Sequence, residues 1–396
     1  MSTLIQEKLA QATQILDEFG VDLWLTFVRE TSMSPDPALD LIAGVDMTWQ
    51  SAFMVGRNGR HTAIVGFYDG ENVRNLNAYD EVIGYHEGIG QHLLAVLKQY
   101  NPQRIAINYS ENDVAADGLS HGLYLALQQY LAETPYADRL ESAEQIIAAV
   151  RGRKSPAEVE RVRQAIVITE QLFDEVEQFA RPGMTQRQIA AFVHKRVDEM
   201  GLGYAWPKPF NPIVTCGPES AVGHAAPGDV VLQKGHTLHL DLGVKKDDYC
   251  SDIQRMWYVL DDGETEAPPE VQRAFDIVYG AIKAGELALG PGTPGWEVDK
   301  AARDFIVDNG FPEYMHGFGH LLGRSAHDGA TILGPRWERY AGICELPVEV
   351  GNIFTLELHV VVPERGIMSL EEDVLVTTDG VEYLSTPQTA LRLIRP

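Results

Sequence analysis

The sequence has 396 residues, of which 45% are hydrophobic, and this length and composition predict a globular protein with two domains. Lysine and arginine together number 32, against 57 aspartate and glutamate residues, so the formal net charge is −25. An acidic chain without a basic run is a poor match for nucleic acid or anionic membranes, and both are excluded as expected partners.

The N-terminal segment MSTLIQEKLAQATQILDEFG has the pattern of an amphipathic helix with charges throughout, unlike a secretory signal peptide. No apolar run approaches the length that spans a membrane. Cys216, Cys250 and Cys344 are scattered and odd in number, so buried thiols are expected rather than disulfides or a zinc knuckle. We therefore predict a cytoplasmic protein.

Residues 1 to about 150 mix helical and strand patterns. The segments VDLWLTFV and RIAINY read as strands, and AFMVGRNGRHTAIVGF reads as a hairpin that turns at Asn58-Gly59. Helical stretches are expected near residues 89–100 and 119–132. This part of the chain, residues 1–150, is predicted to be an α/β domain.

A second domain is predicted over residues 155–396. In RGRKSPAEVERVRQA, Ser155 offers an N-cap, Pro156 a first-turn proline and Glu158 a capping-box acid. Together they predict that a long helix begins here and opens the second domain.

The second domain contains a repeated pattern. PGMTQRQIAAFVHKRVDEMG (182–201) and PGTPGWEVDKAARDFIVDNG (291–310) each run from Pro-Gly through a helical stretch to a closing glycine, 109 residues apart. Gly235 stands six residues before Asp241, as Gly351 stands six before Glu357. Two matches in the same order indicate an internal duplication, with helices followed by a hairpin in each half.

Each predicted hairpin carries two acidic residues. Asp241 and Asp252 are expected to face each other across a turn between Lys246 and Asp247, and Glu357 and Glu371 across a turn centred on Glu364. Four carboxylates on facing strands would be destabilising in an apolar core unless something neutralised them. Divalent cations with oxygen ligands are the usual solution, so a metal site is predicted.

A glycine-rich segment between the acid hairpins, HGFGHLLGRSAHDGA, offers histidine ligands at His316, His320 and His327. His224, in AVGHAAPGD, is a further candidate, whereas His236, His239 and His359 read as structural. Two cations with a bridging hydroxide would give metal-assisted hydrolysis. No Gly-x-Ser-x-Gly elbow or phosphate-binding loop occurs, and Cys216 as a nucleophile has no supporting motif.

The order of these residues resembles the pita-bread (M24-like) metallopeptidases, which comprise methionine aminopeptidases, X-Pro aminopeptidases, prolidases and the metal-free creatinase. DLG, YCSD, HGFGH, FTLE and LEED carry the resemblance, which is strongest to X-Pro dipeptidases and aminopeptidases. It implies an α/β (α+β) fold class: a pseudo-symmetric pita-bread catalytic domain with a smaller, creatinase-like N-terminal α/β domain. The implied metal ligands are Asp241, Asp252, His320, Glu357 and Glu371.

The resemblance also implies a mechanism. A hydroxide that bridges two divalent cations attacks the N-terminal Xaa-Pro or similar peptide bond, and Glu357 shuttles the proton. His224 and His327 hold the substrate and the oxyanion, and His316 is a further active-site histidine. Manganese is the first expectation for the metal, with cobalt, zinc or iron as alternatives. A peptide or dipeptide substrate and a homodimer are implied as partners.

Two positions depart from the family pattern. Glu357 is followed by Leu358-His359 where peptidase members usually have Pro-Gly, and Ser369 stands where prolidases usually have arginine. A missing guanidinium removes a natural partner for a substrate polar group. These departures keep open a non-peptidase hydrolase or lyase of a small metabolite that uses the same metal site. A non-catalytic peptide-binding module is the third alternative.

Overall fold

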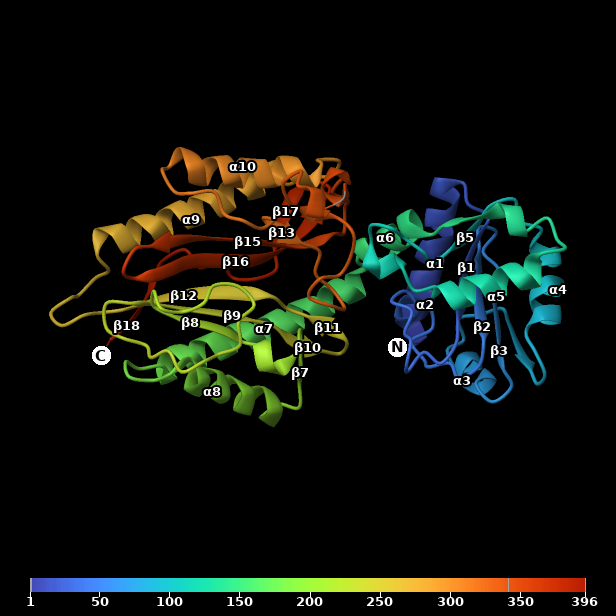
Figure 1. Cartoon of the computed structure of the whole chain (residues 1–396), viewed down its shortest axis with the longest axis horizontal. Helices are drawn as coiled ribbons and strands as arrows, with labels where there is room; N and C mark the ends of the chain where they lie inside the picture. Colours follow the sequence, from blue (N-terminus) through green and yellow to red (C-terminus); the bar gives the residue numbers. More distant parts are fainter. Residues whose placement is uncertain (1, 341, 396) are drawn as a thin grey trace. The chain divides into compact units, whose positions relative to one another are not determined.

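The computed structural model describes residues 2–340 and 342–395, which form two compact units, residues 1–155 and 156–396 (Figure 1). The helices of the first unit are α1 (Ser2–Phe19), α2 (Leu39–Ile42), α3 (Gly70–Arg74), α4 (Gly90–Tyr100), α5 (His121–Leu131) and α6 (Glu144–Gly152). Its strands are β1 (Leu23–Val28), β2 (Ser51–Gly56), β3 (His61–Gly66), β4 (Glu81–Tyr85), β5 (Ile105–Ile107) and β6 (Leu140–Ser142).

The first unit is an α/β/α sandwich around a sheet in the order β4-β3-β2-β1-β5-β6. Alternate residues of β1 point to opposite faces, so Trp24 packs into the core under α1 and α6 while Leu25 packs into the core under α4 and α5. The β2–β3 hairpin turns at Asn58-Gly59, where Gly59 has a φ of 81°. The predicted strands and hairpin of this unit are confirmed.

The second unit holds the remaining elements. Its helices are α7 (Pro156–Phe179), α8 (Gln186–Glu199), α9 (Pro269–Ala288) and α10 (Gly295–Asp308). Its strands are β7 (Gly203–Tyr204), β8 (Ile213–Cys216), β9 (Thr237–Leu242), β10 (Val244–Lys246), β11 (Tyr249–Cys250), β12 (Ile253–Val259), β13 (Gly319–His320), β14 (Ile332–Leu333), β15 (Ile353–Val362), β16 (Gly366–Thr377), β17 (Gly380–Tyr383) and β18 (Arg392–Ile394).

The main sheet of the second unit runs in the order β15-β16-β12-β9-β8, and helices α7 to α10 cover it. α9 packs against β15 and β16, and α7 packs against β10, β11 and β12, as Figure 1 shows. Even-numbered residues of β15, such as Leu356 and Leu358, enter the core under α9, which leaves the odd-numbered residues on the opposite face. Within the described residues, no helix combines the length and apolarity needed to cross a membrane.

The internal duplication is confirmed by matching backbone contacts in the two halves. The amide of Gly183 donates to the carbonyl of Leu232 at 2.8 Å, and the amide of Gly292 donates to the carbonyl of Val348 at the same distance. Both glycines have positive φ values, 94° and 85°. Each Pro-Gly turn therefore holds the start of its helix against the segment that leads to the acid-bearing strand.

The three cysteines are buried and free, as the sequence predicts. Burial raises the pKa of the Cys216 thiol to about 12, so this thiol stays protonated at neutral pH. A protonated thiol is a weak nucleophile, which argues against Cys216 as the catalytic group.

Candidate metal centre

The strand register corrects one prediction about the first hairpin. Asp241 of β9 pairs with Gln254 of β12, so the expected direct pairing of Asp241 with Asp252 is wrong. The turn lies at Asp247-Asp248, one position later than predicted, and both residues have positive φ values of 47° and 68°. Because residues 252 and 254 share a face, Asp252 is still a diagonal neighbour of Asp241.

The second hairpin has the predicted register. Glu357 of β15 pairs with Glu371 of β16, and Glu364 occupies the turn with a φ of 63°. Glu371 in turn pairs with Gln254, which is the single point where β12 and β16 meet in register. The two acid-bearing hairpins are thus joined side by side at the level of their carboxylates.

His320 reaches the acids from the short strand β13. Its Nε2 lies 3.6 Å from Glu357 Oε1 and 3.8 Å from Asp252 Oδ2. Its amide donates to the Thr355 hydroxyl at 3.2 Å. A Cβ on Gly319 would lie 1.9 Å from the carbonyl oxygen of Thr355, so only glycine lets β13 approach β15 this closely.

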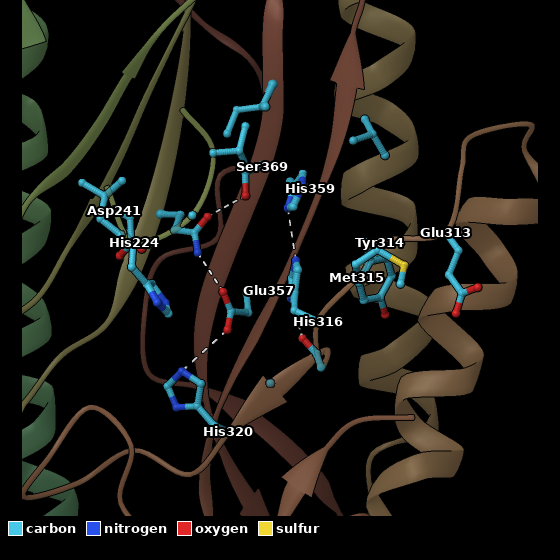
Figure 2. A pocket seen from close by; sticks show the side chains of 18 of the residues that line it. His224, Asp241, Glu313, Tyr314, Met315, His316, His320, Glu357, His359 and Ser369 are labelled. Atoms are coloured by element: carbon cyan, nitrogen blue, oxygen red, sulfur yellow. Dashed lines mark hydrogen bonds and ion pairs between the residues drawn. The ribbon is translucent and has the colours of Figure 1, made fainter. Parts of the chain in front are cut away.

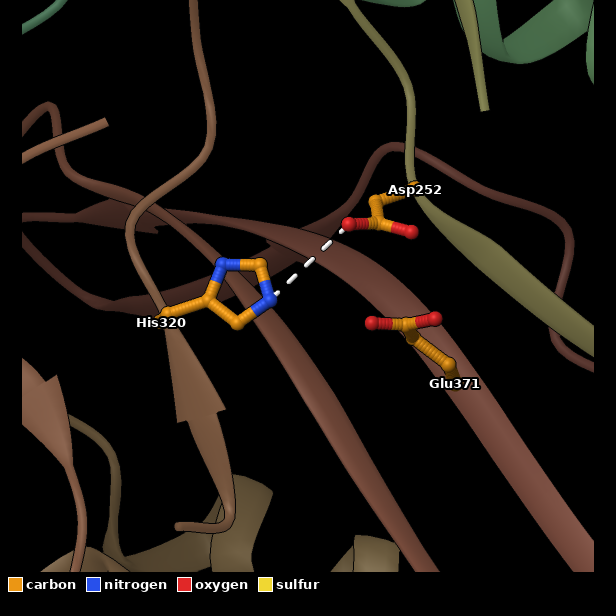
Figure 3. Close-up of side chains that lie close together, drawn as sticks. All are labelled: Asp252, His320 and Glu371. Atoms are coloured by element: carbon orange, nitrogen blue, oxygen red, sulfur yellow. Dashed lines mark ion pairs between the residues drawn. The ribbon is translucent and has the colours of Figure 1, made fainter. Parts of the chain in front are cut away.

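Asp252, His320 and Glu371 each offer a ligand atom within 4.8 Å of the others (Figure 3). Two buried carboxylate oxygens beside them, Asp241 Oδ1 and Glu371 Oε2, have no hydrogen-bond partner among the described residues. Oxygen and imidazole ligands suit a divalent cation, and unpaired buried carboxylates need one. The donor set therefore fits a divalent metal ion.

The acids strongly affect each other's ionisation. Burial, followed by repulsion from neighbouring carboxylates, raises the pKa of Asp252 and of Glu371 well above the usual range. Burial likewise raises the pKa of Asp241 well above its usual range and that of Glu357 to about 7, while it lowers the pKa of His320 to about 3. Without a metal ion, the imidazole is therefore neutral and the carboxyl groups hold their protons more tightly than usual. A bound cation would favour the ionised carboxylates and displace these protons.

A pocket of about 1130 Å³ lies beside this cluster (Figure 2). Asp241, Glu357 and six histidines line it: His224, His239, His316, His320, His327 and His359. The ring of His327 meets that of His320 edge-on, with centroids 4.4 Å apart. The three histidines expected near the substrate, His224, His316 and His327, thus share the pocket with the acids.

Two histidines that were predicted to be structural, His239 and His359, also line this pocket. His359 Nδ1 lies 3.1 Å from His316 Nε2, and the two rings stack with centroids 5.1 Å apart. Their position two residues from Asp241 and Glu357 on the same strands was the signal, because residues two apart share a face.

Sequence reasoning missed two polar residues behind the acids. The Gln254 amide donates to Glu357 Oε2 at 2.9 Å, and Asp373 accepts a hydrogen bond from the Asp252 amide at 3.3 Å. Gln254 shares a strand face with Asp252, and Asp373 with Glu371, so strand alternation could have identified both. Gln254 holds Glu357 by one oxygen and leaves the other, Oε1, facing His320.

Comparison with known proteins identifies the fold and the family. An X-Pro aminopeptidase from Thermotoga maritima superposes with a TM-score of 0.72 at 23% identity, covering 98% of this chain and 99% of the other. A dipeptidase from Mycobacterium ulcerans gives a TM-score of 0.75 at 22% identity, covering 100% and 99%. These structures have the pita-bread fold, so the predicted fold class is confirmed.

Among curated proteins, an uncharacterized peptidase of Staphylococcus haemolyticus is 26% identical over 336 residues, which are 84% of this chain and 87% of the relative. Another, from Staphylococcus saprophyticus, is 27% identical over 335 residues with the same coverage. The model of metallopeptidase family M24 matches residues 160–378, more than half of the chain and all five residues of the predicted ligand set. The chain therefore belongs to metallopeptidase family M24.

Proposed function

We propose that this metallopeptidase holds two divalent cations and hydrolyses the N-terminal Xaa-Pro, or a similar, peptide bond. The observation that carries the proposal is the convergence of four carboxylates, two buried and two half-buried, and one imidazole beside a large pocket. The proposed ligands are Asp241, Asp252, His320, Glu357 and Glu371. Four carboxylates carry more negative charge than one divalent cation offsets, which supports a pair of ions.

Bound divalent cations would polarise the scissile carbonyl and make water a stronger acid at neutral pH. Manganese is our first choice, and cobalt, zinc or iron would also suit a mixed carboxylate and imidazole set. Burial raises the pKa of Glu357 to about 7 in the metal-free site, and bound cations would lower it by stabilising the ionised carboxylate that accepts the proton.

The chain's own residues then have distinct roles. Glu357 accepts a proton from the attacking water and returns it to the leaving nitrogen, while the Gln254 amide keeps the Glu357 carboxylate in place. His224 and His327 donate hydrogen bonds to the substrate carbonyl and to the oxyanion that develops from it. His316 supports the pocket wall through its contact with His359.

The test is turnover by metal-reconstituted protein on Xaa-Pro dipeptides, longer Xaa-Pro peptides and controls without proline. Glu357→Gln keeps the side-chain shape but removes the proton acceptor, so turnover should fall by about 10²–10⁴-fold. Glu133→Gln, which changes an exposed glutamate of the first unit, is the matched control and should leave turnover unchanged. Equal activity in Glu357→Gln would remove the proposed role of Glu357.

A non-peptidase hydrolase or lyase of a small metabolite is the second candidate, because His359 and Ser369 line the pocket at positions that depart from the family pattern. The dipeptide panel separates the two candidates, and retention of metal without any turnover would favour a peptide-binding module. We also propose a cytoplasmic homodimer, which rests on the family resemblance and, for the compartment, on the buried free thiols. Light scattering tests the assembly.

A further inference from the structure

Next to the proposed metal ligands, the pocket floor carries a second row of polar side chains. Thr215 pairs with His239 across β8 and β9, and Ser369 pairs with His359 across β16 and β15. We call these four residues the second row. On their own strands, His239, Ser369 and His359 lie two residues from proposed ligands, a spacing of about 6.6 Å along the strand.

Hydrogen bonds fix the proton positions at His359. His316 Nδ1 lies 2.7 Å from the carbonyl oxygen of Gly317, which can only accept, so this nitrogen donates. In the neutral ring His316 Nε2 is then an acceptor, and the facing His359 Nδ1, 3.1 Å away, must carry the proton. His359 Nε2 is therefore left as a hydrogen-bond acceptor in the pocket wall.

A second chain of bonds fixes the protons at His239. Because the Gln254 amide nitrogen donates to Glu357, its Oε1 accepts, both from His239 Nε2 at 2.9 Å and from the Ser369 hydroxyl at 2.5 Å (Figure 2 shows the bonds at Ser369 and Glu357). His239 Nδ1 is then an acceptor, and it has no partner among the described residues. The Thr215 hydroxyl beside it is buried and also without a partner there.

The charges around the pocket also disfavour a substrate carboxylate. No lysine or arginine occurs among the described residues that line it, whereas Asp241, Glu313 and Glu357 do. Arg303 pairs with Glu313 at 3.1 Å but is not part of the lining. A substrate carboxylate beside the second row would meet ring nitrogens that accept hydrogen bonds, and no fixed positive side chain.

We propose that the second row is a hydrogen-bond-acceptor subsite for an N–H group of the substrate, which selects peptides that continue past, or are amidated at, the residue after the scissile bond. This inference rests on the proposed function. In a peptide, the second amide nitrogen beyond the scissile carbonyl carbon lies roughly 4–5 Å from it, so a hydrogen bond of about 2.9 Å reaches the second row. A dipeptide places a carboxylate oxygen at the same position.

The test compares three substrates of the metal-loaded enzyme: Ala-Pro, Ala-Pro-amide and Ala-Pro-Ala. The first two differ only by the replacement of a carboxylate oxygen with an NH₂ group. We expect kcat/KM to be at least about tenfold higher for the amide and the tripeptide, mainly through KM, because a carboxylate would leave the acceptors unpaired. Calorimetry with proline and prolinamide measures the same preference without turnover.

Variants connect the preference to the second row. His359→Phe removes the ring nitrogens, and with them the acceptor Nε2, so it should reduce the amide-to-acid ratio several-fold at unchanged metal content. His121→Phe, at an exposed histidine of the first unit, should leave the ratio unchanged. Val361 lines the pocket two residues beyond His359 and is 58% exposed, so Val361→Lys can add a cation and should shift preference toward Ala-Pro.

The outcomes separate the inference from the function on which it rests. If Ala-Pro is cleaved as efficiently as Ala-Pro-amide, or more efficiently, the proposed subsite is wrong and the proposed peptidase activity stands. Prolinamide-selective binding without cleavage of any of the three peptides overturns the peptidase alone. If neither cleavage nor selective binding occurs, both fall.

Discussion

At the scale of single residues, Asp252 shows how the candidate metal centre gathers negative charge that a cation would offset. Its carboxylate is buried among other acids and lies 3.8 Å from His320 Nε2, and its backbone amide donates to Asp373. Its pKa is raised well above the usual range, first by burial and then by Asp241. A carboxylate buried among other acids lowers the stability of the fold unless it is paired, which is why a metal ion is expected beside Asp252.

We therefore expect Asp252→Asn to lower the metal content of the purified, reconstituted protein while the fold is retained. The amide keeps the shape but offers a weaker ligand, and it relieves repulsion in the metal-free site. Elemental analysis gives the stoichiometry and thermal denaturation reports the fold. Asp138→Asn, at an exposed aspartate of the first unit, is the matched control. Unchanged metal content in Asp252→Asn would show that the ions bind elsewhere.

Spacing along the sequence singled out the four acids, because they interrupt apolar strands at matching places, whereas the choice of His320 among the clustered histidines came from the family resemblance. Spacing was not sufficient to predict how the acids pair. Asp247 and Asp248 both adopt left-handed conformations, so the turn closes one residue later than the symmetric placement of Asp241 and Asp252 suggests. Gln254 was missed because a neutral amide belongs to no recognised ligand motif, and only its place on the same strand face as Asp252 pointed to it.

At the scale of elements, the β15–β16 hairpin sets the register on which Glu357 and Glu371 depend. Its turn contains Glu364 with a φ of 63°, a conformation that costs a residue with a Cβ about 1–2 kcal/mol. Glu364 is exposed. The turn therefore contains strain that glycine would relieve without any change to the pocket.

Glu364→Gly should raise the free energy of unfolding by about 0.5–1 kcal/mol, since the relieved strain exceeds the added entropy of the unfolded chain. Denaturant titration of the metal-loaded protein measures the change. Glu364→Ala keeps a Cβ and is the control that should give no comparable gain. Destabilisation by glycine and not by alanine would contradict the strained turn.

The sequence also failed to predict a break within the first hairpin. Strands β10 and β11 leave the main sheet and join β7 in a separate three-stranded sheet. A Cβ on Gly243 would lie 2.2 Å from the carbonyl oxygen of Ser251, so the two strands cross closely at this point. Strand propensity cannot predict such a crossing, because the crossing depends on the neighbouring backbone rather than on local residue type.

At the scale of the whole molecule, the duplicated halves and the α/β class followed from repeated glycines and alternating apolar residues. The stability of the metal-free protein is a property at this scale that depends on pH. Glu357 has a pKa of about 7 in the folded site, and Asp241, Asp252 and Glu371 are also raised. In the unfolded chain such groups titrate near pH 4.

Between about pH 4.5 and 7 the folded, metal-free protein thus binds more protons than the unfolded chain, so its free energy of unfolding falls as pH rises. Chelator-treated protein should melt at a lower temperature at pH 8 than at pH 5.5, and manganese should restore much of the loss at pH 8. Differential scanning calorimetry of both forms checks this.

General repulsion from the net charge of −25 also weakens the fold as pH rises, so a control must isolate the centre. The double variant Asp252→Asn/Glu371→Gln removes two of the raised groups and should flatten the pH dependence of the metal-free protein. The same pH dependence in variant and parent would assign the effect to surface charge alone.

The matching backbone contacts at Gly183 and Gly292 also bear on ancestry. The first repeat contributes Asp241 and Asp252, and the second contributes Glu357 and Glu371, so neither repeat contains a complete set of carboxylates. A half-length ancestor could have assembled the four acids only by associating with a second copy of itself. Fusion of two such copies into one chain would make the site independent of concentration and free each half to diverge, as the proposed ligand His320, which lies in the second half, illustrates.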